Sequence, residues 1–254
     1  MQLAVDIGNT NIVFGINQNG LWKNIWRIRT DSKKTADEYE VIFRSLFTSG
    51  KVCKSEIVRV ILSSVVPSLN DNFMDLFSRF LNQKALLIEP CIYDQLPIKI
   101  MNPYQIGTDL VANATAAYTK FARTCMVIDF GTALTFITLS ATGKILGVSI
   151  APGLGTAIRS LAGDTAQLPH VQIAKPPSVL GRNTTHAIQS GVVIGYTGLV
   201  DRIIEQTESE LGEKLHVVAT GGLSRIFSQQ VSRINHFEEN LTLDGLIIIG
   251  DLVS

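Results

Sequence analysis

Two short turns in the sequence combine an aspartate and a glycine with a hydroxyl or amide side chain. They are Asp6-Ile7-Gly8-Asn9-Thr10 and Asp129-Phe130-Gly131-Thr132. Glycine lets the backbone approach a ligand closely, and the exposed N–H groups of such a turn can donate hydrogen bonds to phosphate oxygens. A carboxylate does not bind phosphate directly, but it suits Mg²⁺ or the waters around that ion. The two turns together predict a site for a magnesium nucleotide.

The elements around these turns repeat. Either turn alone would fit an ordinary hairpin, but both lie between two apolar strands and both are followed by a second hairpin turn, at Asn19-Gly20 and at Thr142-Gly143. The expected strands are Gln2–Val5, Ile12–Ile16 and Leu21–Arg29 in the first copy, and Cys125–Ile128, Leu134–Leu139 and Ile145–Ile150 in the second. The sequence therefore predicts an α/β protein in which one unit occurs twice.

Helical spacing of apolar residues fills the intervals between strands. The expected helices are Ala36–Ser49, a helix that begins at Pro67, Thr108–Phe121, a long stretch Thr184–Leu211 interrupted by Gly191, Gly195 and Gly198, and Leu243–Ser254. Further short strands are expected at Ile57–Ser63, Ala85–Ile88 and Val217–Ala219. Because no low-complexity linker separates the halves, we expect lobes 1–117 and 118–254 to pack tightly, with a cleft between them.

The composition excludes several classes of protein. Hydrophobic residues make up 46% and charged residues 17% of the 254 residues, which favours a well-buried globular protein. The 22 basic and 22 acidic side chains leave no net field to hold nucleic acid or an anionic membrane. The N-terminus lacks the pattern of a signal peptide, and apolar runs such as Leu246–Ile249 are too short to cross a bilayer. We therefore expect a cytoplasmic protein with neither a nucleic acid nor a membrane as partner.

Asp109 is the candidate catalytic residue. Phosphoryl transfer needs a carboxylate near the acceptor hydroxyl, to orient it and to take its proton. Asp109 lies where the loop from Asn102 to Gly107 enters a helix, so its carboxylate can point into a cleft. The alternative is that Asp109 only stabilises the first turn of that helix. The sequence has neither a P-loop nor a G-x-G-x-x-G motif, so the two aspartate turns are the phosphate-binding candidates, and the turn Thr220–Ser224 could receive a sugar or phosphate.

Seven blocks in chain order make the sequence resemble the type III pantothenate kinases, the first enzymes of coenzyme A synthesis, over essentially the full length. The blocks are Asp6–Gly15, Gly107–Asp109, Ile128–Ala133, Pro152–Leu154, Thr165–Pro169, Gly181–Thr184 and Thr220–Gly222. The resemblance places the chain in the actin, hexokinase and Hsp70 superfamily. It implies two duplicated ribonuclease H-like, actin-like ATPase lobes, each a mixed sheet flanked by helices, with an interlobe cleft.

The resemblance also implies roles for individual residues. ATP, with Mg²⁺, would be bound by Asp6, Ile7, Gly8, Asn9, Thr10, Asn11, Ile12, Val13 and Thr132, with Asp6 associated with the Mg²⁺. Asp129 would ligate a monovalent cation, K⁺ or NH₄⁺. Asp109 would accept the proton, and pantothenate would be contacted by Gly107, Thr108, Asp109, Leu110 and Thr184. Members of the family are homodimers with substrate sites at the subunit interface, so we expect a homodimer here.

Two positions depart from the family pattern. Leu110 stands where the family has an arginine after its aspartate, and Ile100 stands where the family has a tyrosine seven residues before its glycine. An arginine suits a substrate carboxylate through a bidentate contact, so its absence removes an obvious partner for the acid group of pantothenate. Tyr104 is a candidate to replace the lost ring. Two alternatives therefore stay open: a catalytically weak, nucleotide-binding relative with a regulatory role, and a kinase for another small hydroxylated acceptor.

Overall fold

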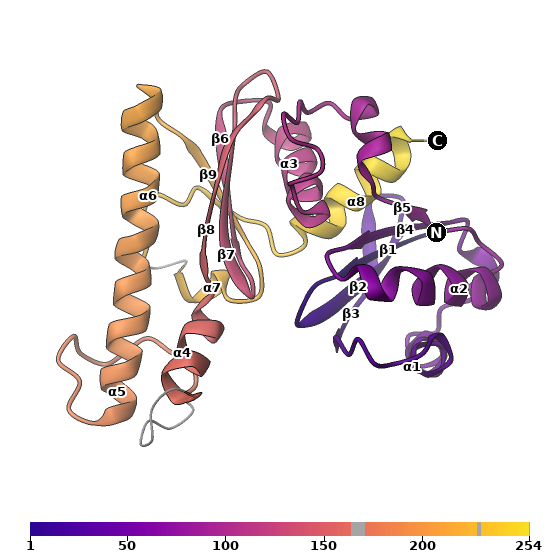
Figure 1. Ribbon diagram of the computed structural model, residues 1–254, viewed down its shortest axis with the longest axis horizontal. Helices are drawn as coiled ribbons and strands as arrows, with labels where there is room; N and C mark the ends of the chain where they lie inside the picture. Colours follow the sequence, from indigo (N-terminus) through magenta and orange to yellow (C-terminus); the bar gives the residue numbers. More distant parts are fainter. Residues whose placement is uncertain (164–170, 228–229, 254) are drawn as a thin grey trace. The chain divides into compact units, whose positions relative to one another are not determined.

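The computed structural model describes residues 1–163, 171–227 and 230–253, and the chain divides into two compact units (Figure 1). Unit 1 comprises Met1–Lys120 together with Leu241–Ser254, and unit 2 comprises Phe121–Asn240. The block Thr165–Pro169, which contributes to the family resemblance, lies outside the described residues.

Unit 1 is built on a mixed five-stranded sheet in the order β3-β2-β1-β4-β5. Its strands are β1 (Gln2–Ile7), β2 (Asn11–Gln18), β3 (Leu21–Arg29), β4 (Arg59–Ser64) and β5 (Leu86–Leu87). Its α-helices are α1 (Ala36–Ser49), α2 (Asn70–Leu81), α3 (Thr108–Phe121) and α8 (Leu241–Leu252), and short 3₁₀ turns cover Lys54–Glu56, Pro67–Leu69 and Pro90–Gln95. The first three strands are antiparallel, whereas β4 runs parallel to β1.

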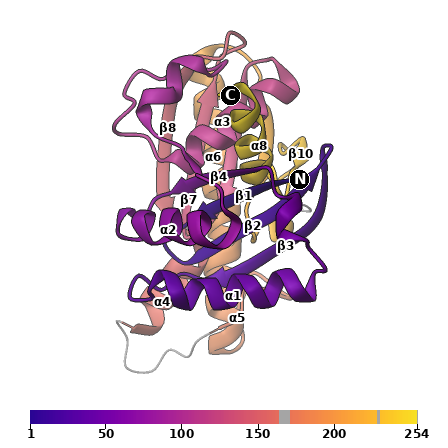
Figure 2. The same ribbon diagram turned by 90° about the vertical axis from the view of Figure 1, so that its right-hand side faces the viewer.

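Helices α1 and α2 lie side by side on one face of this sheet (Figure 2). Aromatic rings fill the space beneath them, and the rings of Phe14 and Phe43 stack with their centroids 4.2 Å apart. Helix α8 packs on the opposite face of the sheet. Gly250 of α8 lies so close to Ile61 of β4 that an added Cβ would contact the Ile61 side chain, and this side chain is not part of the core under α1 and α2. The sheet is thus buried on both faces, which holds β1 and β4 in fixed register.

Unit 2 repeats the topology of unit 1. Its sheet has the order β10-β9-β6-β7-β8, and its strands are β6 (Cys125–Phe130), β7 (Ala133–Leu139), β8 (Ile145–Pro152), β9 (His216–Thr220) and β10 (His236–Phe237). The hairpins β6-β7-β8 are antiparallel and β9 runs parallel to β6, as in β1-β2-β3 and β4. The predicted fold class, with a duplicated unit built on a mixed sheet, is confirmed.

The helices of unit 2 are α4 (Leu154–Gly163), α5 (Thr184–Gln189), α6 (Gly195–Leu211) and α7 (Ser224–Phe227). The predicted long helical stretch consists of α5, a π-helical turn over Ser190–Ile194, and α6. Val200 and Ile204 of α6 pack into the core that covers β6 and β9. A Cβ on Gly191, Gly195 or Gly198 would have no atom within 4 Å, so these glycines do not serve close packing among the described residues.

The C-terminal helix differs from the expected division of the chain. The lobe expected at 118–254 included it, whereas α8 belongs to the compact unit of the N-terminal half. Gly245 lies directly against the backbone of Ala112 in α3, and the Trp22 Nε1–H donates to Asp244 at 2.6 Å. The apolar helix therefore completes the core of unit 1. Within the described residues, none of the helices is long and apolar enough to span a membrane.

Candidate active site

The first aspartate turn is held by the residue that follows β3. The Gly8 N–H donates to the Asn11 carbonyl at 3.0 Å, which closes the turn. Thr30 then contacts it twice: its hydroxyl donates to the Gly8 carbonyl at 2.6 Å and its N–H donates to the Thr10 carbonyl at 3.0 Å. No local motif in the sequence indicates Thr30, because its role depends on pairing between strands.

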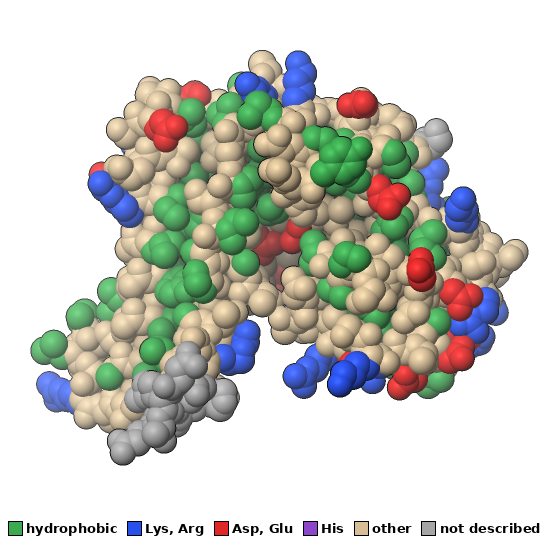
Figure 3. All heavy atoms as spheres, viewed as in Figure 1, with side chains coloured by type: hydrophobic (Ala, Val, Ile, Leu, Met, Phe, Trp, Pro, Cys, Tyr) green, Lys and Arg blue, Asp and Glu red, His purple; other side chains and the backbone are tan. Residues whose placement is uncertain are grey.

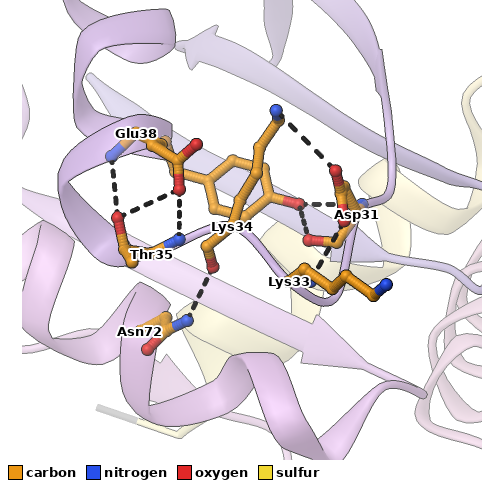
Figure 4. Close-up of polar contacts among 7 residues, drawn as sticks. Asp31, Lys33, Lys34, Thr35, Glu38 and Asn72 are labelled. Atoms are coloured by element: carbon orange, nitrogen blue, oxygen red, sulfur yellow. Dashed lines mark hydrogen bonds and ion pairs between the residues drawn. The ribbon is translucent and has the colours of Figure 1, made fainter.

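The loop that follows Thr30 is anchored to helix α1 (Figure 4). The Asp31 N–H donates to the Tyr39 hydroxyl at 3.0 Å, and that hydroxyl donates to the Asp31 carbonyl at 2.9 Å. Thr35 and Glu38 form a capping box at the start of α1, in which each side chain accepts from the backbone N–H of the other residue. Thr30 is therefore attached to a well-fixed segment, which in turn fixes the shape of the Gly8–Thr10 turn.

Among the predicted ATP-binding residues of this turn, the polar ones are partly accessible. Asn9 is exposed, and Asp6, Gly8 and Thr10 are half-buried. Ile7 and Ile12 are fully buried in the core, so only their backbone groups could face a nucleotide.

Asp6 is joined to the start of helix α3 through Ser63. Asp6 in β1 lies opposite Ser63 in β4, and the Ser63 hydroxyl donates to Asp6 Oδ1 at 2.9 Å. The same hydroxyl lies 2.9 Å from the Thr108 hydroxyl, which also accepts from the Ser64 N–H at 3.1 Å. We call these contacts among Asp6, Ser63 and Thr108 the Ser63 bridge. It brings two predicted functions, nucleotide binding and acceptor binding, together within one unit.

Asp109 is the residue after Thr108 of the Ser63 bridge, and its side chain is half-buried. Burial raises the pKa of its carboxyl group, while hydrogen bonds from the backbone of Leu110 and of Asp109 itself act in the opposite direction. The Leu110 N–H donates to Asp109 Oδ1 at 2.8 Å. A Cβ at position 107 would collide with the Asp109 carboxylate, so Gly107 leaves the space that this carboxylate occupies. Leu110 itself is buried, so its side chain packs inside the unit and its backbone positions the candidate base.

A cavity of about 540 Å³ lies in the same unit, in the segment before Asp109. Its walls come from Pro90, Cys91, Tyr93, Asp94, Leu96, Ile98, Lys99, Ile100, Pro103 and Tyr104. Burial, with the charge of Asp109 as a second cause, raises the pKa of the Tyr93 phenol to about 12. Tyr93, whose pKa is influenced by the charge of Asp109, belongs to the cavity wall. The cavity wall thus contains Ile100, one of the two departures from the family pattern, and Tyr104, the candidate replacement for the lost ring.

The second aspartate turn lies in unit 2 beside the Thr220–Gly222 turn. The Gly131 N–H donates to the Ala133 carbonyl at 3.1 Å, and Asp129 pairs with Thr220 across β6 and β9. Gly221 has a positive φ of 90°, and a Cβ there would collide with the Asp129 carboxylate. Glycine is therefore required at position 221 both for the backbone conformation and for the space that Asp129 uses.

Helix α4 contacts the same turn and places a positively charged side chain near it. The Thr132 carbonyl accepts from the Gly153 N–H at 3.0 Å and from the Thr156 hydroxyl at 2.8 Å. The Arg159 guanidinium donates to the Thr156 hydroxyl at 3.2 Å. Arg159 thus places a positive charge next to the predicted phosphate-binding turn of unit 2, and no sequence motif indicates this role.

The donor set suits a magnesium ion that keeps most of its ligands from phosphate and water. Among the residues that the structure describes, no group of three or more His, Cys, Asp or Glu could hold a metal ion. Mg²⁺ in nucleotide sites is typically bound through only one or two carboxylates plus substrate phosphates. Asp6, oriented by Ser63 at the end of β1, fits that mode.

The predicted site residues thus form one set in each unit. Unit 1 brings together Asp6, the Gly8–Thr10 turn, Thr108 and Asp109, and unit 2 brings together Asp129 and Thr132. Thr184 is the exposed first residue of α5 in unit 2, and its contact with the acceptor stays a prediction.

Comparison with known proteins identifies the family. The sequence model of the family described as type III pantothenate kinase matches residues 2–206. A type III pantothenate kinase from Treponema pallidum (strain Nichols) is 44% identical over 257 residues, covering 99% of this chain and 94% of its own. One from Myxococcus xanthus (strain DK1622) is 39% identical over 249 residues, covering 98% of this chain and 97% of its own.

A solved structure shows the same fold at low sequence identity. The ethanolamine utilization protein EutJ from Carboxydothermus hydrogenoformans matches with a TM-score of 0.59 and 16% identity, covering 99% of this chain and 89% of that one. The likeness shows a shared α/β fold over nearly the whole of both chains. By the family match and the full-length relatives, the chain belongs to the type III pantothenate kinase family.

Proposed function

We propose that this protein transfers the γ-phosphate of ATP to the primary hydroxyl of pantothenate, and that Asp109 accepts the hydroxyl proton. The observation that carries the proposal is the Ser63 bridge, because it joins Asp6 of the phosphate-binding turn to Thr108, the neighbour of Asp109. Membership of the family supplies the identity of both substrates.

The surroundings of Asp109 suit a general base. A base is most effective when its pKa lies near the working pH, and burial moves the pKa of Asp109 upward in that direction. The Leu110 N–H fixes one carboxylate oxygen at 2.8 Å and so orients the group. We propose that this orientation lets Asp109 align the attacking hydroxyl as well as accept its proton.

The two glycine turns are the proposed phosphate contacts. In unit 1, backbone N–H groups of the Gly8–Thr10 turn would donate to phosphate oxygens, and Asp6 would hold Mg²⁺ or its waters. Mg²⁺ supplies charge neutralisation on the phosphates during transfer. In unit 2, Thr132 would contact ATP, with Arg159 near the same turn. Asp129 would hold the monovalent cation, K⁺ or NH₄⁺.

Lys99 is the proposed partner of the pantothenate carboxylate. Leu110, which replaces the family's arginine, is buried and carries no charge. Lys99 lines the cavity to which Tyr93 and Tyr104 also belong, and Asp94 is the other charged residue of its wall. An exposed ammonium group can pair with a carboxylate as a point charge, although without the bidentate geometry of arginine. Lys99 and Tyr104 would thereby supply the positive charge and the aromatic ring that Leu110 and Ile100 lack.

An acceptor assay tests the proposed function. Purified protein with ATP, Mg²⁺, K⁺ and pantothenate should yield ADP and 4′-phosphopantothenate in equal amounts. A panel of other small hydroxylated acceptors, each with and without a carboxylate, is run in parallel. Faster turnover of a different acceptor would reassign the substrate, and nucleotide binding without transfer to any acceptor would favour the regulatory alternative.

A further inference from the structure

Ser63 is a buried polar residue at the centre of the Ser63 bridge, and the mechanism above gives it no role of its own in binding or proton transfer. Its side chain is fully buried, and its hydroxyl has two side-chain partners, Asp6 Oδ1 and the Thr108 hydroxyl, each at 2.9 Å. A buried hydroxyl is costly unless its hydrogen bonds are made, so this position is closely determined by its partners. Both partners belong to segments assigned to the reaction.

We propose that Ser63 and Thr108 are positioning residues that couple the metal-associated carboxylate of Asp6 to the helix that carries Asp109. The inference rests on the proposed function, whose phosphate donor and general base it links. The Ser63 O–H is donated to the Asp6 carboxylate, which is a strong, charge-assisted bond. Thr108 completes the bridge on the other side of Ser63.

Thr108 is fixed by three groups of β4. Its hydroxyl accepts from the Ser64 N–H at 3.1 Å, and its own proton can go to the Ser63 hydroxyl at 2.9 Å or to the Ser64 carbonyl at 3.2 Å. Either choice joins the first residue of α3 to the end of β4. Since Thr108 immediately precedes Asp109, these bonds set where the helix begins and how the candidate base is presented.

Coupling makes a prediction that a purely local role does not make. Loss of the Thr108 hydroxyl removes a partner of Ser63, so Asp6 should be oriented less well even though Thr108 does not touch Asp6. Removing the Thr108 hydroxyl would then weaken Mg²⁺-ATP binding, although Thr108 is expected to contact pantothenate. A residue that only stabilises the fold would lower the melting temperature and leave nucleotide affinity unchanged.

The experiment measures Mg²⁺-ATP affinity by calorimetry without any acceptor, in the full-length protein, in four single variants and in the double variant Ser63→Ala/Thr108→Val. Thr108→Val keeps the shape and removes the hydroxyl, Thr108→Ser restores the hydroxyl, and Ser63→Ala removes the centre of the bridge. Thr115→Val is the matched control, because Thr115 is a buried threonine of the same helix whose hydroxyl donates to the Val111 carbonyl at 2.8 Å.

We expect Thr108→Val and Ser63→Ala each to weaken Mg²⁺-ATP binding by roughly 3- to 10-fold, the usual effect of losing one such hydrogen bond. Thr108→Ser should restore the affinity, and Thr115→Val should lower only the melting temperature. The double variant Ser63→Ala/Thr108→Val should bind no more weakly than the worse single variant, because both remove the same bridge. Unchanged affinity in Thr108→Val, or additive losses in the double variant, would overturn the coupling.

The outcomes for the two proposals are distinguishable. If the wild-type protein binds Mg²⁺-ATP but phosphorylates no pantothenate, the proposed function fails while the binding series still decides the coupling. If the wild-type protein does not bind Mg²⁺-ATP, Asp6 is not a nucleotide site and the coupling fails too. In active protein, Thr108→Val should also lower kcat, because the placement of Asp109 depends on the same hydroxyl.

Discussion

Burial of Asp109 acts in opposite directions on stability and on catalysis. The pKa of its carboxyl group is raised by burial in the folded protein, so the folded state holds the proton more tightly than the unfolded state does. Stability is therefore lost as the pH rises from about 4, the ordinary range of an aspartate, through the folded-state pKa. The same shift brings the group closer to the pH at which a base works well. The site thus gives up some stability for reactivity.

Replacing Asp109 by asparagine should separate these effects. Asp109→Asn should lower kcat by roughly 10²- to 10⁴-fold, because it removes the proton acceptor. The same variant should melt at a higher temperature than wild type at neutral pH, and this gain should shrink toward pH 4. Turnover and melting curves at several pH values measure both. Asp71→Asn, at an exposed position in the first turn of α2, is the control that should alter neither strongly. Near-normal turnover of Asp109→Asn would remove Asp109 from the role of base.

Lys99 allows a test of carboxylate recognition. Lys99→Met keeps the length of the side chain and removes its charge, so the KM for pantothenate should rise by about 10-fold, a typical effect for one charge-assisted contact, with kcat little changed. Lys99→Arg should retain most of the affinity. The KM for pantothenol, which lacks the carboxylate, should be the same in wild type and in Lys99→Met. A rise in KM for both acceptors would show that Lys99 shapes the cavity rather than binding the acid group.

The sequence predicted the residues that local motifs carry, and missed those that depend on strand pairing. Asp6, Asp129 and their glycines stand out because each turn is contiguous in sequence. Ser63 and Thr30 gave no such signal, because their contacts with Asp6 and Gly8 arise from the register of β1 with β4 and from the position of β3. That register is set by burial on both sheet faces, which no short motif records.

At the scale of elements, the strands and most helices agree with the predicted segments, because alternating and helical apolar patterns were long and bounded by clear turns. The C-terminal helix was predicted as a helix but expected with the second half of the chain. An apolar helix that follows unit 2 in sequence gives no sign of which sheet it will cover. The deciding features are Gly245 and Gly250, which allow it to approach Ala112 and Ile61 of unit 1.

Adding one methyl group at Gly245 therefore tests whether α8 packs closely on α3. Gly245→Ala places a Cβ against the backbone of Ala112, which cannot give way as a flexible side chain can. We expect a loss of about 1–3 kcal/mol in the free energy of unfolding, the usual cost of overpacking. The control Gly198→Ala in α6 has open space around its Cβ and should stabilise by about 0.5–1 kcal/mol through helix propensity. Chemical denaturation compares them. Equal stability of the two variants would contradict the close packing of α8 on α3.

At the scale of the whole molecule, strand β8 presents an exposed apolar row at the edge of a sheet. It is the edge strand of the unit 2 sheet, and its apolar side chains on one face are exposed, at 37% for Leu146, 40% for Val148 and 69% for Ile150. Figure 3 shows hydrophobic side chains exposed over the part of unit 2 that carries β7 and β8 in Figure 1. Open apolar edges favour association with another chain. We infer that this edge contributes to the homodimer expected from the family resemblance.

The dimer prediction can be tested through charge. Light scattering after size exclusion should give about twice the monomer mass of 27.7 kDa for the wild-type chain. Val148→Glu puts a charge in the centre of the exposed β8 row, and because a two-fold interface uses each patch on both subunits, two like charges would enter it at once. We expect this variant to be largely monomeric at micromolar concentration. Val41→Glu, at an exposed apolar position on α1 that is 67% accessible, should stay dimeric. If acceptor sites are completed across the subunit interface, the Val148→Glu monomer should keep Mg²⁺-ATP binding and lose pantothenate binding. If the Val148→Glu variant is still a dimer, the interface does not include β8.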